Sequence, residues 1–227
     1  MKKPHVEEVE NFEQKCPVVF VIDRSGSMEG SPIEEVNNGM NEFLNGILSD
    51  PVTKNRLDLA IISYDNNIRV EREFGLLDKN TKMPRLEAGG LTYTVEALQK
   101  AIELVEERKE YYKQVGLTYY RPYIILLTDG YANDRSGLAN MARKIQNGII
   151  NKKFNFWGFG IEDANMEELN MFAGENSIIQ KIKDIDNLST FFEWLSGSFG
   201  KVSHSRQGDI IDMTPEAGQN AFMQTVG

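Results

Sequence analysis

The sequence contains a single cysteine, Cys16, and no long run of apolar residues. One cysteine cannot form a disulfide within the chain, so nothing in the sequence indicates an oxidising compartment. The apolar run YIILL at 123–127 is far too short to cross a bilayer as a helix, which takes about 20 residues. The opening segment MKKPHVEEVENFEQKC carries acidic side chains where a signal peptide has its apolar region. We therefore expect a cytoplasmic protein.

Basic segments are also missing. The 227 residues include 25 Lys and Arg against 34 Asp and Glu, which gives a net charge of −9 at pH 7 and a pI near 4.9. Nucleic acids and anionic lipid surfaces both require a basic footprint on the protein, and no run rich in Lys or Arg provides one. We therefore expect no nucleic-acid partner and no membrane partner.

Apolar runs that alternate with amphipathic segments indicate an α/β fold. The run PVVFVID at 17–23 is apolar up to its last residue, which is typical of a strand buried on both faces. The runs at 121–129 and 154–160 repeat this pattern, and segments with apolar residues at helical spacing lie between them. The alternation predicts a doubly wound, mostly parallel six-stranded sheet with helices on both faces.

The remaining strands set the edges of the sheet and the limits of the domain. The segments 57–65 and 68–74 predict a hairpin, and the second of them alternates apolar with charged residues, as an antiparallel edge strand does. Further strand and helix patterns continue to 202. We therefore predict one domain over 16–202, an N-terminal extension over 1–15 and a polar C-terminal tail over 203–227.

Two of the predicted buried strands end in a carboxylate. Asp23 ends the first strand and is followed by the hydroxyls of Ser25 and Ser27, and Asp129 ends the strand at 121–129. Ligands of open α/β sheets bind at the carboxyl ends of the strands. If the two strands are neighbours, these side chains converge at one edge, where Thr92 can join them from a third loop.

Such a group is an all-oxygen donor set without His or Cys. It suits Mg²⁺ or Mn²⁺ with water in the remaining positions, and Ca²⁺ takes the same kinds of ligand. Asp and Ser after a strand are most often ordinary turn and capping residues. Asn133 and Asp134 could lie at the rim of the metal site and influence the choice of partner, but a helix-capping role is favoured for them. The metal interpretation is favoured because the D-x-S-x-S segment directly follows an apolar strand and LLTDG ends another.

Three segments, VFVIDRSGSM, GGLT and IILLTDG, together resemble the von Willebrand factor type A domain with its metal-ion-dependent adhesion site, or MIDAS. The resemblance covers roughly 16–202, with the segments in the order of the family, and it implies a Rossmann-like fold. The segments SGSMEGSPIEEVNNGM, GFGIEDANMEELNMFA and FFEWLSGSFGKVS look most like bacterial tellurite-resistance proteins of the TerY type.

The resemblance implies a role for each matching residue. Asp23 corresponds to the aspartate that anchors the metal mostly through water, and Ser25 and Ser27 correspond to the two serines that coordinate through their hydroxyls. Thr92 takes the place of the family's threonine and Asp129 that of its second aspartate.

One departure from the family affects the threonine. This chain has Gly-Gly-Leu-Thr where Gly-Gly-Thr is commoner. The inserted Leu91 makes Thr94 an alternative to Thr92 as the metal ligand.

A cation held by two aspartates, with one coordination position open, could accept an Asp or Glu carboxylate from another protein. We therefore expect a metal-dependent protein-binding module rather than an enzyme. The resemblance implies that it acts in a cytoplasmic bacterial stress-response complex of the tellurite-resistance type.

Two other functions fit the sequence less well. A metal-dependent phosphatase or phosphotransferase would use Asp23 as nucleophile, but it needs a second aspartate two residues later, where this chain has Ser25. A nucleotide-binding Rossmann domain is disfavoured because GFG at 158–160 lacks the G-x-G-x-x-G continuation and ends a late strand.

Overall fold

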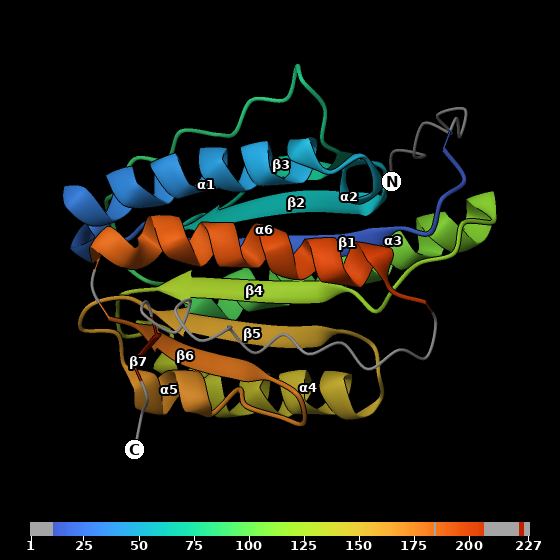
Figure 1. Ribbon diagram of the computed structural model, residues 1–227. Helices are drawn as coiled ribbons and strands as arrows, with labels where there is room; N and C mark the ends of the chain where they lie inside the picture. Colours follow the sequence, from blue (N-terminus) through green and yellow to red (C-terminus); the bar gives the residue numbers. More distant parts are fainter. Residues whose placement is uncertain (1–10, 184, 207–222, 225–227) are drawn as a thin grey trace.

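The computed structural model describes residues 11–183, 185–206 and 223–224, and a seven-stranded sheet runs through them in the order β3-β2-β1-β4-β5-β6-β7 (Figure 1). All neighbouring strands are parallel except at the two edges, where β3 pairs antiparallel with β2 and β7 pairs antiparallel with β6. The strands are β1 (Cys16–Asp23), β2 (Leu57–Tyr64), β3 (Ile68–Leu76), β4 (Tyr123–Thr128), β5 (Asn155–Gly160), β6 (Ile178–Ile182) and β7 (Met223–Gln224).

Helices cover both faces of the sheet (Figure 1). One face carries α1 (Ser31–Ser49), α2 (Pro51–Arg56) and α6 (Leu188–His204), and the other carries α3 (Thr94–Val115), α4 (Leu138–Ile150) and α5 (Met166–Asn170). Three short 3-10 turns are η1 (Gly26–Met28), η2 (Arg135–Gly137) and η3 (Ile185–Asn187). The predicted doubly wound α/β fold is confirmed.

The apolar run of β1 explains the two hydrophobic cores. All eight residues of this central strand are buried. Because side chains alternate across a strand, Phe20 and Ile22 join the core under α1 and α6, whereas Val19 and Val21 join the core under α3 and α4. A continuous apolar run is therefore what this position in the sheet requires.

The edge strand β3 has the opposite pattern. Its residues alternate between half-buried and exposed over most of its length, and it pairs with β2 alone. Charged side chains on such a strand discourage pairing with another chain. The prediction of an antiparallel edge strand over 68–74 is confirmed, and the strand extends to Leu76.

Two elements were not predicted. Asp50 and Pro51 end α1 as expected, but Pro51 also starts α2, which Asp50 caps by accepting a 3.0 Å hydrogen bond from the Val52 N–H. The two-residue β7 lies within the segment predicted as a tail, and it adds a seventh strand and a second antiparallel edge to the six strands that were predicted. The rest of that tail beyond residue 206, and residues 1–10 of the predicted extension, lie outside the described residues.

The topology places two strand ends together. β1 and β4 are neighbours, with Ile22 opposite Leu127, so Asp23 and Asp129 leave the sheet at the same edge. The chain then enters α1 on one face after β1 and α4 on the other face after β4 (Figure 1). This change of direction is the switch point at which open α/β sheets bind their ligands.

Candidate metal centre

The carboxylate of Asp23 is fully buried and held from two sides. Its Oδ1 accepts a 2.9 Å hydrogen bond from the backbone N–H of Ser25, and its Oδ2 accepts a 2.5 Å hydrogen bond from the hydroxyl of Thr128. Burial raises the pKa of Asp23, and these hydrogen bonds offset part of that rise. The side chain therefore has a fixed position, with lone pairs that remain available to a further donor or cation.

A chain of hydroxyl groups links the loop after β1 to the end of β4. The Oγ atoms of Ser25 and Ser27 are 3.1 Å apart, and the Ser27 hydroxyl donates a 2.7 Å hydrogen bond to Oδ1 of Asp129. Ser25 and Asp129 are buried and Ser27 is exposed, so the group opens to solvent on one side. The predicted convergence of these residues is present in the structure.

Thr92 borders the same space. A methyl group built on Gly130 would lie 3.5 Å from Oγ of Ser27 and 3.6 Å from Oγ1 of Thr92, so both hydroxyls are near one point. The backbone N–H of Thr92 donates to Oδ1 of Asn133 (2.7 Å), and the backbone carbonyl of Thr92 accepts from the Asn133 N–H (2.8 Å). These two bonds fasten the loop before α3 to the loop after β4.

Thr94 has a different environment. It is the first residue of α3, and its hydroxyl lies 3.5 Å from the phenolic oxygen of Tyr64. Within the described residues, Thr94 makes no hydrogen bond to Ser27 or Asp129. The geometry therefore favours Thr92 over Thr94 as the third hydroxyl of the group.

The electrostatics of the centre are those of two buried acids without a counter-ion. Burial and the nearby charge of Asp23 raise the pKa of Asp129 to about 6, although the hydrogen bond from Ser27 lowers it. Across 11–183 and 185–206, no Lys or Arg nitrogen forms an ion pair with either carboxylate. Arg24 is adjacent in sequence, but its guanidinium pairs with Asp65.

A hard divalent cation fits this donor set. Its charge would offset the cost of burying Asp23 and Asp129, and the three hydroxyls are oxygen ligands of the kind that Mg²⁺, Mn²⁺ and Ca²⁺ take. No group of three or more His, Cys, Asp or Glu side chains is arranged to hold a metal within the described part of the chain. A cation at this edge would therefore depend on the serine and threonine hydroxyls.

A glycine turn holds the loops in register. The carbonyl of Gly90 accepts a 3.0 Å hydrogen bond from the N–H of Gly26, beside the two serines. Gly90 has φ +85°, and a Cβ there would lie 2.3 Å from Oδ1 of Asn66. Only glycine satisfies both conditions, which explains the Gly-Gly pair before Thr92.

Several supporting residues were not predicted. Thr128 holds Asp23, and Asn133 holds Thr92 instead of capping a helix. Asp134 is a cap, as predicted, but it caps α3 from a distant loop: its Oδ2 accepts from the N–H groups of Val95 (2.8 Å) and Glu96 (3.1 Å). The only sequence signal for Thr128 was its place in LLTDG, which does not identify a partner.

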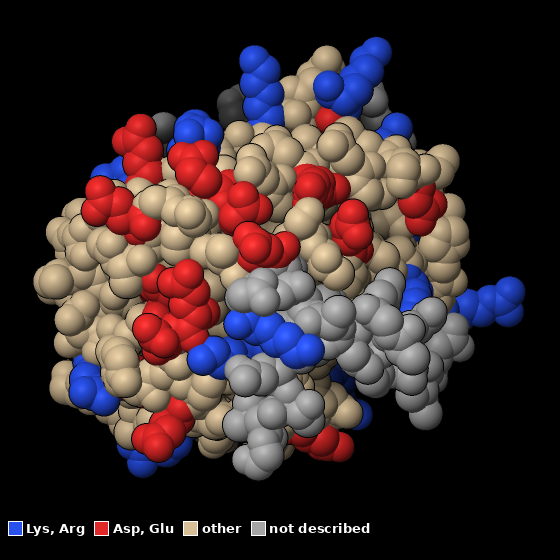
Figure 2. All heavy atoms as spheres, turned by 60° about the vertical axis from the view of Figure 1, so that its left-hand side comes forward, with Lys and Arg blue, Asp and Glu red and all other residues tan. Residues whose placement is uncertain are grey.

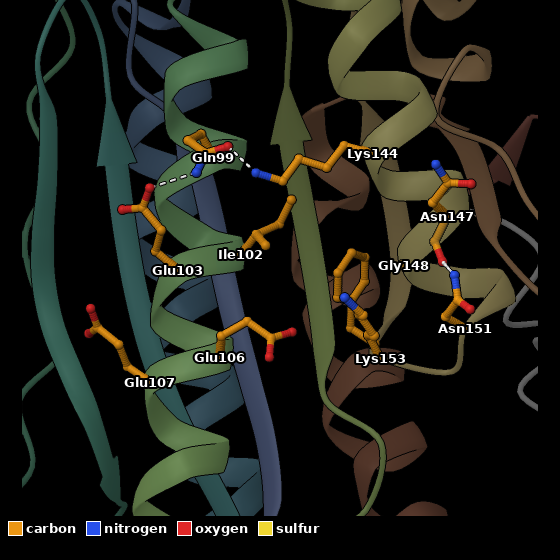
Figure 3. Close-up of a pocket in the computed structure, with 11 residues that line it drawn as sticks. Gln99, Ile102, Glu103, Glu106, Glu107, Lys144, Asn147, Gly148, Asn151 and Lys153 are labelled. Carbon is orange, nitrogen blue, oxygen red and sulfur yellow. Dashed lines mark hydrogen bonds between the residues drawn. The ribbon is translucent and has the colours of Figure 1, made fainter.

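A cleft of about 510 Å³ lies elsewhere, between α3 and α4 (Figure 3). Gln99 donates a hydrogen bond to Glu103 at 2.6 Å and accepts one from Lys144, and Glu106 pairs with Lys109 outside the lining. The lining carries Lys144 and Lys153 beside its three glutamates, whereas the carboxylates of the candidate metal centre have no Lys or Arg paired to them among the described residues.

No helix among the described residues is both long enough and apolar enough to cross a membrane.

Comparisons with known proteins identify the family and the fold. The sequence matches the von Willebrand factor type A domain family over residues 18–194. The collagen alpha-5(VI) chain of Mus musculus is 26% identical over 204 residues, which are 86% of this chain and 7% of the collagen chain. The chain therefore spans a small fraction of that relative's length.

Two solved structures share the fold. A von Willebrand factor type A protein from Catenulispora acidiphila has a TM-score of 0.66 at 21% identity, covering 83% of this chain and 43% of that one. Proximal thread matrix protein 1 from the mussel byssus, solved with a zinc-occupied MIDAS motif, has a TM-score of 0.55 at 17% identity, covering 82% and 46% of the respective chains. Because the family match covers more than half of its length, this chain belongs to the von Willebrand factor type A domain family.

Proposed function

We propose that this domain binds other proteins through a divalent cation held by Asp23, Ser25, Ser27, Thr92 and Asp129. Domains of this family typically mediate protein–protein interactions and bind divalent metal at a MIDAS. The observation that carries the proposal is the convergence of two buried carboxylates and three hydroxyls at the switch point of the sheet, without a Lys or Arg among the described residues to balance the charge.

The residues of the proposed site have different roles in holding the metal ion. Thr128 and the Ser25 N–H fix the orientation of Asp23, so that its carboxylate can hold metal-bound water. Ser25, Ser27 and Thr92 offer neutral oxygens, so the negative charge of the group comes from the two aspartates alone. Two carboxylates balance a dipositive ion without excess negative charge, so a carboxylate from a partner is not strongly repelled. Because Ser27 is exposed, the outer side of the group is open to a partner. When bound, Mg²⁺ or Mn²⁺ supplies a coordination position for an Asp or Glu carboxylate.

The cellular setting is part of the proposal. The resemblance to TerY-type proteins supports a role in a bacterial tellurite-resistance or related stress-response complex, in the cytoplasm. The same resemblance supports Mg²⁺ as the ion, with Mn²⁺ and Ca²⁺ as alternatives. We also propose that the domain has no enzymatic activity of its own, since position 25 carries a serine in place of the second aspartate of a phosphotransferase.

A peptide array tests the proposed binding. Peptides with a central Glu or Asp, and matched peptides with Gln or Asn, are probed with the domain in Mg²⁺ or in EDTA. We expect retention on the carboxylate peptides in Mg²⁺ only, and loss of that retention in the Asp129→Ala variant. Glu73→Gln is a matched control, because it removes an exposed carboxylate of edge strand β3 outside the ligand group. Equal retention of Glu and Gln peptides would overturn the proposal.

A turnover assay tests the non-enzymatic part. We expect no hydrolysis of an aryl phosphate in the presence of Mg²⁺. Turnover that disappears in the Asp23→Asn variant would instead establish a phosphatase.

A further inference from the structure

Exposed apolar side chains border the candidate metal centre. Among the residues that the structure describes, the exposed large apolar side chains are Phe12, Leu91, Tyr131, Ile150 and Met171. Leu91 directly precedes Thr92 and is 50% exposed, and Tyr131 follows Asp129 and Gly130 and is 57% exposed. Two of these five side chains thus stand beside the proposed ligands, on the two loops that Asn133 joins.

Both side chains are carried by backbone that is held in place. The loop of Leu91 is fixed on one side by the Gly90 carbonyl and on the other by the Thr92–Asn133 bonds. The guanidinium carbon of Arg135 lies 5.8 Å from the centre of the Tyr131 ring. An apolar surface that is already ordered loses little conformational entropy when a partner covers it.

The loop of Tyr131 is fastened by a carboxylate from another element. Glu168 of α5 accepts a 3.0 Å hydrogen bond from the Ala132 N–H through Oε2, and its Oε1 lies 2.7 Å from the guanidinium of Arg135. Glu168 thereby fixes the residue after Tyr131 and the cation that lies against its ring.

The charged surroundings limit what the partner can carry. Glu29, Glu162 and Asp163 are exposed on loops at this end of the sheet, and Glu162 is close enough to raise the pKa of Asp129. Figure 2, in which the carboxyl ends of the strands come forward, shows Asp and Glu side chains scattered over the upper and left-hand parts of this face, with a group of Lys and Arg side chains below the centre. A partner segment with several carboxylates would be repelled by them.

We propose that the partner presents a single Asp or Glu next to an apolar side chain, and that Leu91 and Tyr131 bind this apolar side chain. The inference rests on the proposed function, because the metal centre fixes where the carboxylate lies. Leu91 and Tyr131 then select the partner, since covering their exposed surface favours an apolar neighbour over a polar one. The inserted Leu91, which departs from the commoner family pattern, acquires a role in specificity.

The test uses peptides that share a central Glu and differ in its neighbours. Each peptide of the array has Leu, Phe, Ser or Glu on either side of the central Glu, and the array is probed with the Mg²⁺-saturated domain. We expect peptides with Leu or Phe to be retained about tenfold more strongly than those with Ser. Peptides with flanking Glu are expected to bind most weakly.

Variants locate the source of this preference. Leu91→Ser and Tyr131→Ser are each expected to reduce the preference for Leu over Ser severalfold, while calorimetry with Mg²⁺ checks that the metal centre has kept its shape. Ile150→Ser and Met171→Ser are matched controls, because they remove exposed apolar side chains that do not border the centre. The preference should persist in both controls.

The outcomes separate the two proposals. EDTA-sensitive retention that does not depend on the residues beside the central Glu would overturn this inference. The proposed function would be unaffected by that result. A flank preference that survives in Leu91→Ser and Tyr131→Ser would also overturn it. An array without any EDTA-sensitive retention would overturn the proposed function and this inference together.

Discussion

Buried carboxylates at the two ends of the sheet have different partners. At the amino end of β2, Asp58 is fully buried, and its Oδ2 lies 2.7 Å from the guanidinium of Arg108 and accepts a hydrogen bond from the phenol of Tyr112. At the carboxyl ends of β1 and β4, Asp23 and Asp129 receive hydroxyl and N–H donors but, within the described residues, no Lys or Arg.

The two ends of the sheet differ in the source of the positive charge that balances the buried carboxylates. A buried charge without a partner is costly, so a protein that buries a carboxylate usually provides a cation or a proton. Arg108 meets that requirement at one end, and its guanidinium also lies 4.5 Å from the centre of the Tyr111 ring. At the other end Asp129 has no Lys or Arg paired with it among the described residues, and its pKa is raised. A metal ion from solution would supply the missing positive charge.

Removing either aspartate of the metal centre is expected to have the largest effect, and that effect is on metal affinity. We expect Asp23→Ala or Asp129→Ala to weaken Mg²⁺ or Mn²⁺ binding by more than about 100-fold, because each removes a full negative charge from the cation. The fold should persist, since neither carboxylate forms an ion pair within the described residues. Calorimetry measures the affinity and circular dichroism the fold; unchanged affinity in both variants would contradict the account.

Removing the cation at the opposite end has a different effect. We expect Arg108→Met to lower the free energy of unfolding by about 3 kcal/mol, because Asp58 stays buried and loses its ion pair, although Lys15 and Arg72 still act on its charge. Mg²⁺ affinity should stay the same. Denaturant unfolding and calorimetry test the two statements.

A second substitution serves as the control. Adding Asp58→Asn to Arg108→Met should recover part of the lost stability, because it removes the orphaned charge. Failure to recover any stability would show that the loss came from packing against Tyr111 and Tyr112 rather than from the charge.

Acid should act on the metal centre through Asp129. Its pKa of about 6 lies above the ordinary value of 3.8, so the group is half protonated near pH 6 and mostly protonated below pH 5. A protonated carboxyl is a poor ligand, so we expect Mg²⁺ affinity to be nearly constant above pH 7 and to fall about tenfold per pH unit below pH 6. Titrations between pH 7.5 and 5 that gave one constant affinity would contradict this.

The smallest expected change in Mg²⁺ affinity distinguishes Thr92 from Thr94 as the metal ligand. Thr92→Ala should weaken Mg²⁺ binding about tenfold, whereas Thr94→Val, which keeps the shape of the side chain, should change it less. The reason is that Thr92 faces Gly130 and Ser27, whereas Thr94 contacts Tyr64. The reverse ranking in calorimetry would assign the ligand role to Thr94.

Much of the fold could be predicted because burial leaves a direct trace in sequence. The all-apolar β1 and the alternating β3 are each identified by their own residues, and their places in the sheet follow from those patterns. The six-residue α2 was missed because it is too short to develop a helical period, and its cap is the same Asp50 that marks the end of α1.

The candidate centre was predictable in its ligand types but not in its supports. Asp23, Ser25 and Asp129 stand at strand ends that sequence patterns locate. That Thr128 holds Asp23 depends on the register between β1 and β4, which neither strand encodes alone. Asp134 likewise caps α3 across a gap of 39 residues, whereas sequence motifs for caps refer only to the adjacent helix.

Crystals soaked in Mn²⁺ test the central claim most directly, because anomalous diffraction locates the ion without assumptions about its ligands. The account predicts one strong peak at the carboxyl ends of β1 and β4, roughly 2.1 Å from the hydroxyl oxygens of Ser25 and Ser27. A peak in the cleft between α3 and α4, beside Glu103 and Glu106, with none near Asp23 and Asp129, would contradict it.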